Sequence, residues 1–226
     1  MFTGLVECIA EINGARRNTR GLLELSLAVP LDLADSRVGD SFCIHGACLT
    51  AVGFAASSLQ VEVSQETIDR TTLSLHAQGR KVNVERALRL SDRLGGHLVT
   101  GHIDGIGHVV ERKSEGSNVC FRIRATEQVA RYVVEKGSIC VDGVSLTVGT
   151  FQEEIFSVFL IPHTLSQTTL QYLRAGDAVN LEADIIGKYV EKLLFAKEPG
   201  RPDAKKAIDE KFLIEHGFLS KSGKLR

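Results

Sequence analysis

The sequence lacks the features that mark several classes of protein. Its formal net charge is −1 over 226 residues, so there is no electrostatic reason to expect a nucleic acid or an acidic membrane as a partner. No apolar run approaches the roughly 20 residues that a membrane-spanning helix needs. The opening residues, MFTGLVECIAEI, lack the basic start and the long apolar stretch of a signal peptide. We therefore expect a cytoplasmic protein with no nucleic-acid or membrane partner.

Cysteines and cofactor motifs are also scarce. The five cysteines are odd in number and form no dense framework, so reduced thiols are expected. Cys43-x-His45-x-x-Cys48 could be half of a zinc site, with His97 or His102 as a further ligand, but the paired spacings of structural zinc are missing. The sequence contains neither GxGxxG after a strand nor GxxxxGK[ST]. It therefore predicts no metal and no cofactor.

What the chain does contain is an internal duplication. Segments recur at a constant offset of 97 residues, and residues 1–86 laid without gaps over 98–183 share 19 identical pairs, against roughly 5 expected by chance. The recurring pairs are CIHGACLT (43–50) with CVDGVSLT (140–147), QETIDRTTL (65–73) with PHTLSQTTL (162–170), and KVNVE (81–85) with AVNLE (178–182). Each repeat has the length of a small domain.

Both repeats read mainly as short strands with glycine turns, which predicts an all-β fold with a small closed or nearly closed barrel in each. The strands LLELSL (22–27) and VCFRIR (119–124) alternate one residue out of phase, so small compensating insertions are expected. A helix is expected over 126–137, and a shorter one in each copy of the segment at 66–73 and 163–170.

The second repeat is followed by a stretch with helical spacing. Residues 184–198 carry an apolar stripe that either packs on its own barrel or associates with copies of itself. Proline and glycine then interrupt the pattern, and a short terminal helix is expected over 207–217. The predicted domains are barrels at 1–97 and 98–184, a helix at 185–198, and an extension at 199–226.

Chemistry that needs one unique centre should show as a difference between the repeats. Cys48 faces Ser145 at the 97-residue offset, Leu5 faces His102, and Glu66 faces His163. Cys48 could equally be a small buried hydrophobic residue, and His102 could simply hydrogen-bond a turn. Shared polar pairs, such as Ser41 with Ser138 and Thr50 with Thr147, suggest that the two barrels bind two similar ligands.

Several motifs together resemble one family. They are MFTGLVE at the start, S-x6-CLT at 41–50, GGHLVTGHIDG at 95–105, VDGVSLTV at 141–148, LIPHTL at 160–165 and VNLEADIIGKYVEKLL at 179–194. In order and spacing they are similar to riboflavin synthases of the trimeric alpha-chain type, from residue 1 to about 197. The resemblance implies two tandem six-stranded Greek-key barrels and a C-terminal helix that makes a homotrimer.

The resemblance also implies a reaction. Two molecules of 6,7-dimethyl-8-ribityllumazine dismutate by transfer of a four-carbon unit, which yields riboflavin and 5-amino-6-ribitylaminouracil without a metal or organic cofactor. The active site is expected between the N-terminal barrel of one subunit and the C-terminal barrel of another. Association with lumazine synthase is a further implied partnership. The alternative is a non-catalytic lumazine or flavin carrier of the antenna type, which tends to lose the catalytic set.

The family's functional positions fall on residues of both repeats. The implied catalytic residues are Ser41, Cys48, His102 and Thr147. Substrate contacts implied for the N-terminal barrel are Gly4, Val6, Thr50, Glu62, Ser64, Glu66 and Thr67, and Phe2 and Thr3 match the family's start. Those implied for the C-terminal barrel are Gly101, Ile103, Lys136, Ser145, Ile161, Pro162, Thr164, Ser166 and Asp184.

Elementary chemistry agrees with these roles. The lumazine C7 methyl is acidic because its carbanion delocalises into the ring, so a histidine such as His102 suits the proton transfer, and Thr147 could orient it. A free thiol is mostly protonated at neutral pH, which favours Cys48 as a contact or proton donor over a covalent nucleophile. His45 stands where the family usually has Asn. It is either a conservative change in a left-handed turn or a second titrating group near the acceptor.

Overall fold

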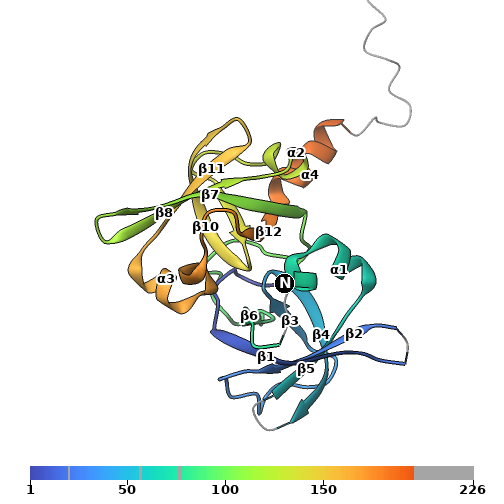
Figure 1. The fold of residues 1–226 in the computed structure, drawn as a ribbon. Helices are drawn as coiled ribbons and strands as arrows, with labels where there is room; N and C mark the ends of the chain where they lie inside the picture. Colours follow the sequence, from blue (N-terminus) through green and yellow to red (C-terminus); the bar gives the residue numbers. More distant parts are fainter. Residues whose placement is uncertain (20, 56–57, 76–77, 196–226) are drawn as a thin grey trace, which may run out of the picture. The chain divides into compact units, whose positions relative to one another are not determined.

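Two closed antiparallel barrels make up most of the chain. A computed structural model describes residues 1–19, 21–55, 58–75 and 78–195, and Figure 1 shows the two barrels. The N-barrel consists of β1 (Cys8–Arg17), β2 (Leu23–Ala28), β3 (Ser41–Ile44), β4 (Ala47–Ala55), β5 (Ser58–Val63) and β6 (Lys81–Arg86). The C-barrel consists of β7 (Gly105–Glu115), β8 (Asn118–Arg124), β9 (Ser138–Val141), β10 (Val144–Gln152), β11 (Ile155–Leu160) and β12 (Ala178–Ala183).

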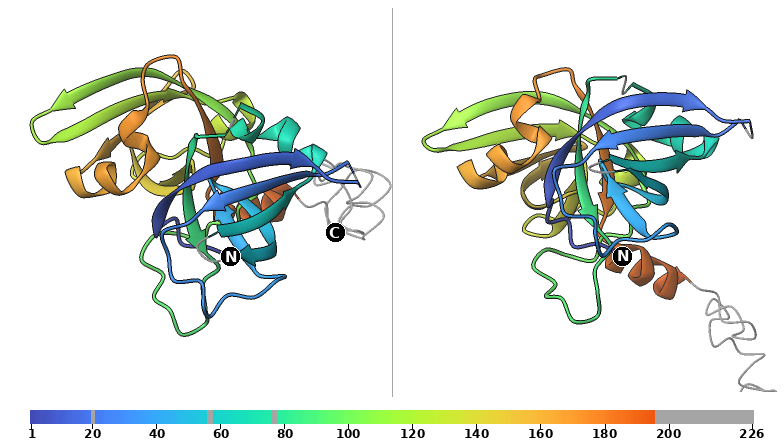
Figure 2. Two further views of the ribbon diagram at one scale, coloured as in Figure 1. Left: turned by 60° about the horizontal axis from the view of Figure 1, so that its bottom comes forward. Right: turned by 90° about the horizontal axis from the view of Figure 1, so that it is seen from below.

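The strand order confirms the duplication and the Greek-key prediction. It is β1-β2-β5-β4-β3-β6 in the N-barrel, and the C-barrel repeats it with β7-β8-β11-β10-β9-β12 around its closed ring. Closure leaves no free sheet edge, which a barrel of short strands would otherwise expose. Figure 2 shows the long first hairpins, β1–β2 in blue and β7–β8 in green, extending in opposite directions.

The one-residue phase difference between repeats lies in these first hairpins. Ile12 in β1 pairs with Leu27, and its twin Val109 in β7 pairs with Ile123. The first two paired residues are 27 − 12 = 15 positions apart in sequence, and the second two are 123 − 109 = 14 positions apart. The second hairpin is therefore one residue shorter, and the inward-facing positions of both barrels still match. The expected compensating change is confirmed.

The short helices lie where the duplication predicts them, but one predicted helix is wrong. After β5 come α1 (Gln65–Arg70) and the 3₁₀ turn η1 (Thr72–Leu75), and after β11 come α3 (Pro162–Gln167) and η2 (Thr169–Tyr172). The helix expected over 126–137 is reduced to α2 (Glu127–Ala130). β-branched Val133 is buried in the C-barrel core, and Lys136 has a left-handed φ of 65°, so the chain turns toward β9 instead of continuing the helix.

The last described element is α4 (Ile185–Phe195). Both barrels belong to one compact unit, Met1–Lys188, and the residues from Tyr189 onward belong to a second unit. The expected helix at 207–217 lies outside the described residues, and the bounds of the four predicted domains stay predictions. No helix among the described residues has the length and apolar character to span a membrane.

The barrels meet through twin residues that contact each other reciprocally. Phe2 bridges Val99, its own twin, and both are completely buried together with Cys43 and Cys140, another twin pair. Such reciprocal contacts are those of a two-fold interface, here within one chain. Cys43 and Cys140 are therefore core residues of the contact between the barrels.

Candidate functional site

The segment that opens each repeat packs against the barrel of the other repeat. Ser145 in β10 donates its backbone N–H to the carbonyl of Gly4 at 2.8 Å, and Cys48 in β4 donates to Gly101 at the same distance. A Cβ added to either glycine would lie 2.6 Å from the Cβ of the facing residue, and both glycines have positive φ. Only glycine fits these two positions, because any side chain would overlap the opposite barrel.

This exchange corrects the predicted grouping of contacts by barrel. Val6 packs on the core of the C-barrel and Ile103 on the core of the N-barrel. Gly4 and Val6 therefore belong with the C-barrel, and Gly101, His102 and Ile103 with the N-barrel. Pattern matching missed this because the two repeats are equivalent in sequence, whereas the crossing of their first segments exists only in three dimensions.

Two buried carboxylates hold the crossing segments. Glu85 at the end of β6 accepts hydrogen bonds from the backbone N–H and hydroxyl of Thr3, each at 2.6 Å, and from Gly4 N at 3.0 Å. Glu182 in β12 does the same for Thr100 and Gly101. Burial raises the pKa of both carboxyl groups, and these hydrogen bonds lower it. Each barrel thus uses an equivalent anchor to place the other barrel's opening segment.

A row of predicted contacts runs along the outside of the N-barrel. Thr50 in β4 lies opposite Ser41 in β3 and Glu62 in β5. Because alternate residues of a strand face the same side, Cys48 and Ser64 continue this row toward the end of the barrel. There Cys48 is half-buried.

The start of α1 and the neighbouring histidine complete the N-barrel site. Ser64 accepts the N–H of Thr67 at 3.1 Å and caps α1, so the helix start is held beside the strand row. His102 is exposed and directly follows Gly101, whose carbonyl binds Cys48. Ser41, Cys48 and His102, three of the four predicted catalytic residues, therefore lie on or beside this barrel. Glu66 points to its own helix, since it pairs with Arg70 across one turn.

The twin row on the C-barrel has a different chemical character. Thr147 lies opposite Ser138 and is exposed, and Ser145 next to it on the same face is half-buried. The position of Glu62 is taken by Phe159, which is 50 % exposed. Ile161 stands before α3, whose first residue is Pro162. The C-barrel row is thus more apolar than the N-barrel row, although the backbone is equivalent.

Ser145 has a histidine partner that the sequence interpretation considered only as a zinc ligand. The Nδ1 of His97 lies 2.7 Å from the Oγ of Ser145, and the imidazole is 7 % exposed. Burial lowers the pKa of His97, and the carboxylate of Asp184 raises it. In the sequence, His97 lies in the GGHLVTGHIDG motif at 95–105, five residues before His102.

The structure separates several predicted contacts from the two rows. Phe2 is completely buried in the interface between the barrels, away from both rows, and its contact with substrate stays a prediction. Lys136 is exposed in the left-handed turn before β9. Ser166 donates to the carbonyl of His163 within α3, and Thr164 accepts through its carbonyl from Thr168. Ser166 and Thr164 therefore belong to α3 rather than to the strand row of the C-barrel.

His45 occupies a left-handed turn, as one of its two interpretations predicted. Its φ is 52°, and its twin Asp142 has a φ of 48°. The two turns face each other across the barrel interface, with His45 Nε2 3.3 Å from Asp142 Oδ1. Among the described residues, no cluster of three His, Cys, Asp or Glu side chains is placed to hold a metal ion.

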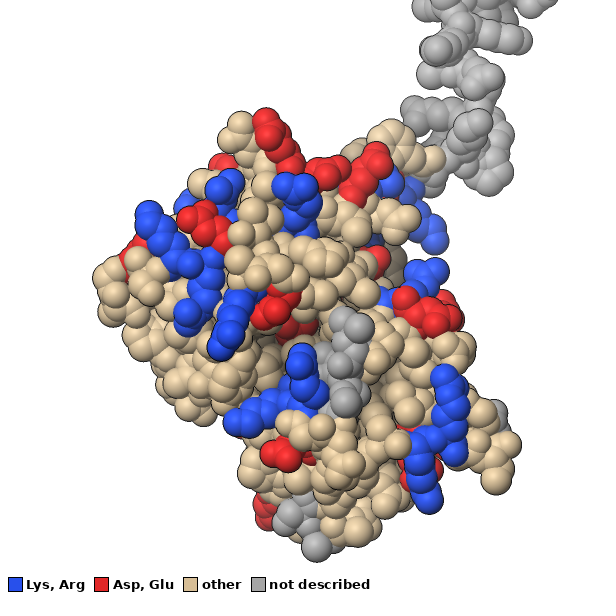
Figure 3. All heavy atoms as spheres, in the orientation of Figure 1, with Lys and Arg blue, Asp and Glu red and all other residues tan. Residues whose placement is uncertain are grey.

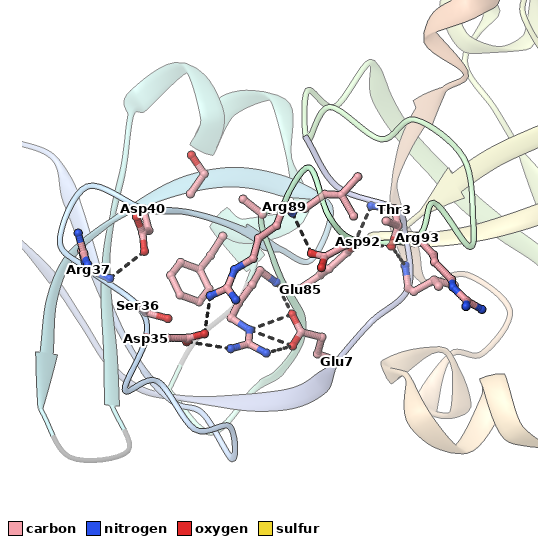
Figure 4. Close-up of a pocket in the computed structure, with 16 residues that line it drawn as sticks. Thr3, Glu7, Asp35, Ser36, Arg37, Asp40, Glu85, Arg89, Asp92 and Arg93 are labelled. Atoms are coloured by element: carbon pink, nitrogen blue, oxygen red, sulfur yellow. Dashed lines mark hydrogen bonds and ion pairs between the residues drawn. The ribbon is translucent and has the colours of Figure 1, made fainter.

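A pocket of about 700 Å³ opens on the N-barrel, and Ser41 is the one predicted site residue that lines it. Its charged groups neutralise one another: Arg86 pairs with Glu7 and Asp35, and Arg89 also pairs with Asp35 (Figure 4). The face of the molecule in Figure 3 likewise mixes acidic and basic side chains. These observations do not single out an anionic or cationic ligand.

The fold and the two equivalent rows define a class: chains built from a duplicated ligand-binding barrel. The model of the lumazine binding domain matches residues 3–87 and again 100–184. The chain is 38 % identical over 220 residues to a riboflavin synthase of Photobacterium phosphoreum, covering 97 % of this chain and all of the relative. A riboflavin synthase of Mycobacterium bovis is 44 % identical over 198 residues, covering 86 % of this chain and 98 % of the relative.

Solved structures agree with this class. LumP in complex with riboflavin matches with a TM-score of 0.73 and 25 % identity, covering 81 % of this chain and 99 % of LumP. The chain belongs to the riboflavin synthase family of lumazine-binding proteins. The predicted family and the predicted all-β, two-barrel fold are both confirmed.

Proposed function

We propose that the chain catalyses the dismutation of two 6,7-dimethyl-8-ribityllumazine molecules to riboflavin and 5-amino-6-ribitylaminouracil, with one lumazine on each barrel. The observation that carries this proposal is the duplicated site. Both repeats match the lumazine binding domain, and both present a strand row beside a short helix at equivalent positions. A reaction between two like molecules is served by two like binding sites, and the two copies of the lumazine binding domain support this arrangement.

The roles of the side chains follow from their placement. Cys48 and Ser41 on the N-barrel are suited to polar contact with the acceptor ring, and His102 beside them is suited to proton transfer. Thr147 and Ser145 provide the hydroxyl groups on the C-barrel. Holding the two rings in the reacting orientation would supply much of the rate, since orientation contributes as much as ~7–11 kcal/mol. No metal or organic cofactor takes part in this scheme.

The assembly we propose is a cytoplasmic homotrimer in which the N-barrel of one subunit faces the C-barrel of another. Support comes from α4, where Ile186, Val190 and Leu193 form a stripe at helical spacing and are 58 %, 48 % and 75 % exposed. Exposed apolar stripes of this kind are typical of helices that associate. We also propose lumazine synthase as a partner, on the basis of the family resemblance.

The test is direct. Purified protein mixed with 6,7-dimethyl-8-ribityllumazine should produce riboflavin, seen by its absorbance, with one riboflavin formed for every two lumazines consumed. Stoichiometric lumazine binding without any riboflavin would instead establish a carrier of the antenna type. A Cys48→Ala protein, compared at equal lumazine saturation, should be slower by tenfold or more if Cys48 contacts the reacting ring.

A further inference from the structure

Ser145 is held in place more tightly than an ordinary surface serine. Its backbone binds Gly4, and a Cβ added to Gly96 would lie 3.0 Å from its Cβ and 3.1 Å from its Oγ. The backbone N–H of His97 in turn binds the carbonyl of Thr3 at 3.2 Å. The side chains of Ser145 and His97 therefore meet in a confined space, and their 2.7 Å contact is well defined.

The surroundings of His97 decide which atom carries the hydrogen. Burial lowers the pKa of His97, which favours the neutral imidazole, and Asp184 is the charged group that opposes this effect. The Nε2 atom is buried with no hydrogen-bond partner among the described residues. A buried N–H without an acceptor is rarer and more costly than a buried acceptor without a donor. The tautomer with hydrogen on Nδ1 is therefore favoured, and Nδ1–H donates to Ser145 Oγ.

This arrangement leaves the hydroxyl hydrogen of Ser145 free to point outward. Ser145 is half-buried, so its hydroxyl can reach a ligand on the C-barrel row. The twin residue Cys48 has a thiol, which is a weaker donor than a hydroxyl group. The C-barrel thus has a stronger and better oriented hydrogen-bond donor than the N-barrel.

We infer that His97 is a positioning residue for the lumazine on the C-barrel, acting by fixing the Ser145 hydroxyl as a donor to an acceptor atom of the ring. This rests on the proposed function. When the C7 methyl of a lumazine loses its proton, negative charge spreads onto the ring oxygens and nitrogens. A pre-oriented donor stabilises that charge more than it stabilises the neutral ring, so it lowers the barrier. The pair therefore favours deprotonation of the lumazine bound to the C-barrel.

Two substitutions of His97 separate hydrogen bonding from packing. Asn places an amide N–H where the imidazole has Nδ1–H, whereas Gln places it near Nε2. We expect His97→Gln to lower kcat about tenfold, the worth of one hydrogen bond to a developing charge, and His97→Asn to stay within about threefold of wild type. The kcat of Ser145→Ala should equal that of His97→Gln. The double variant that combines Ser145→Ala with His97→Gln should have a kcat no lower than that of Ser145→Ala alone.

Further measurements on these variants control for folding and for the proposed function. His108→Gln changes an exposed histidine of β7 and should leave kcat and KM unaltered. Equal loss in His97→Asn and His97→Gln, or additive losses in the double variant, would overturn the positioning role. A wild-type protein that forms no riboflavin would overturn the proposed function instead.

Discussion

At the scale of single residues, the barrel interface holds a carboxyl group that is removed from water. Asp142 is 1 % exposed, and burial raises its pKa from 3.8 to about 8, while the hydrogen bond from Asn180 N acts in the opposite direction. In the unfolded chain, Asp142 loses its proton as the pH rises above the ordinary pKa of 3.8, whereas in the folded chain it keeps the proton until the pH approaches about 8. The stability that Asp142 contributes is therefore full below about pH 4 and is lost as the pH rises to about 8.

This linkage gives a residue-scale prediction. The free energy of unfolding of the wild type should fall between pH 6 and pH 8, at up to about 1.4 kcal/mol per pH unit from this group. The Asp142→Asn protein should lack that part of the slope, because the amide does not titrate. Urea unfolding of both proteins at pH 6, 7 and 8 measures the difference. His45 is present in both, so parallel curves would show that Asp142 does not titrate as its burial requires.

At the scale of elements, β6 and β12 are joined to the opposite barrel by twin asparagines. Asn83 in β6 donates to the carbonyl of Asp142 and accepts the N–H of Thr169, both at 2.8 Å. Asn180 in β12 does the same with His45 and Thr72. Each side chain thus satisfies two buried backbone groups of the other repeat, which explains why KVNVE and AVNLE share their asparagine.

Replacement of one such asparagine should therefore be costly. Asn83→Ala leaves the carbonyl of Asp142 and the N–H of Thr169 buried without partners, which should reduce the free energy of unfolding by about 2–4 kcal/mol. Asn13→Ala in β1 is the matched control, because Asn13 is exposed, and it should change stability by less than about 0.5 kcal/mol. Denaturant unfolding compares the two. Similar losses in both variants would show that these interface hydrogen bonds contribute little.

At the scale of the whole molecule, the proposed trimer depends on α4. Val190→Lys with Leu193→Lys places two charges on its apolar stripe and should shift the sedimentation coefficient from trimer to monomer. Riboflavin formation should fall with it, since each active site is proposed to need two subunits. Lys192→Gln is a polar change at an exposed residue of the same helix, and this variant should keep both the trimer and the riboflavin formation. An active monomer would show that one chain contains a complete site.

Most of the fold follows from local patterns. Alternating apolar residues, glycine turns and the 97-residue offset predict an all-β chain with an equivalent barrel in each repeat, because each depends on neighbours in sequence. The number of six strands in each barrel came from the family resemblance. The helix over 126–137 fails because burial of Val133 overrides a helical pattern. Cys48 and Thr50 fall on one barrel face because alternate residues of a strand face the same side, and the pairing of β3 with β4 places Ser41 opposite Thr50.

The sequence by itself determined the duplication, the barrel class and the family of this protein. Only the tertiary structure decided which barrel receives which opening segment, that Phe2 is an interface residue, and that His97 contacts Ser145 while His45 faces Asp142. The physical reason is that a repeat encodes the contacts inside each barrel twice. The contacts between the barrels are long-range, and a two-fold interface between twins leaves no periodic trace in the chain.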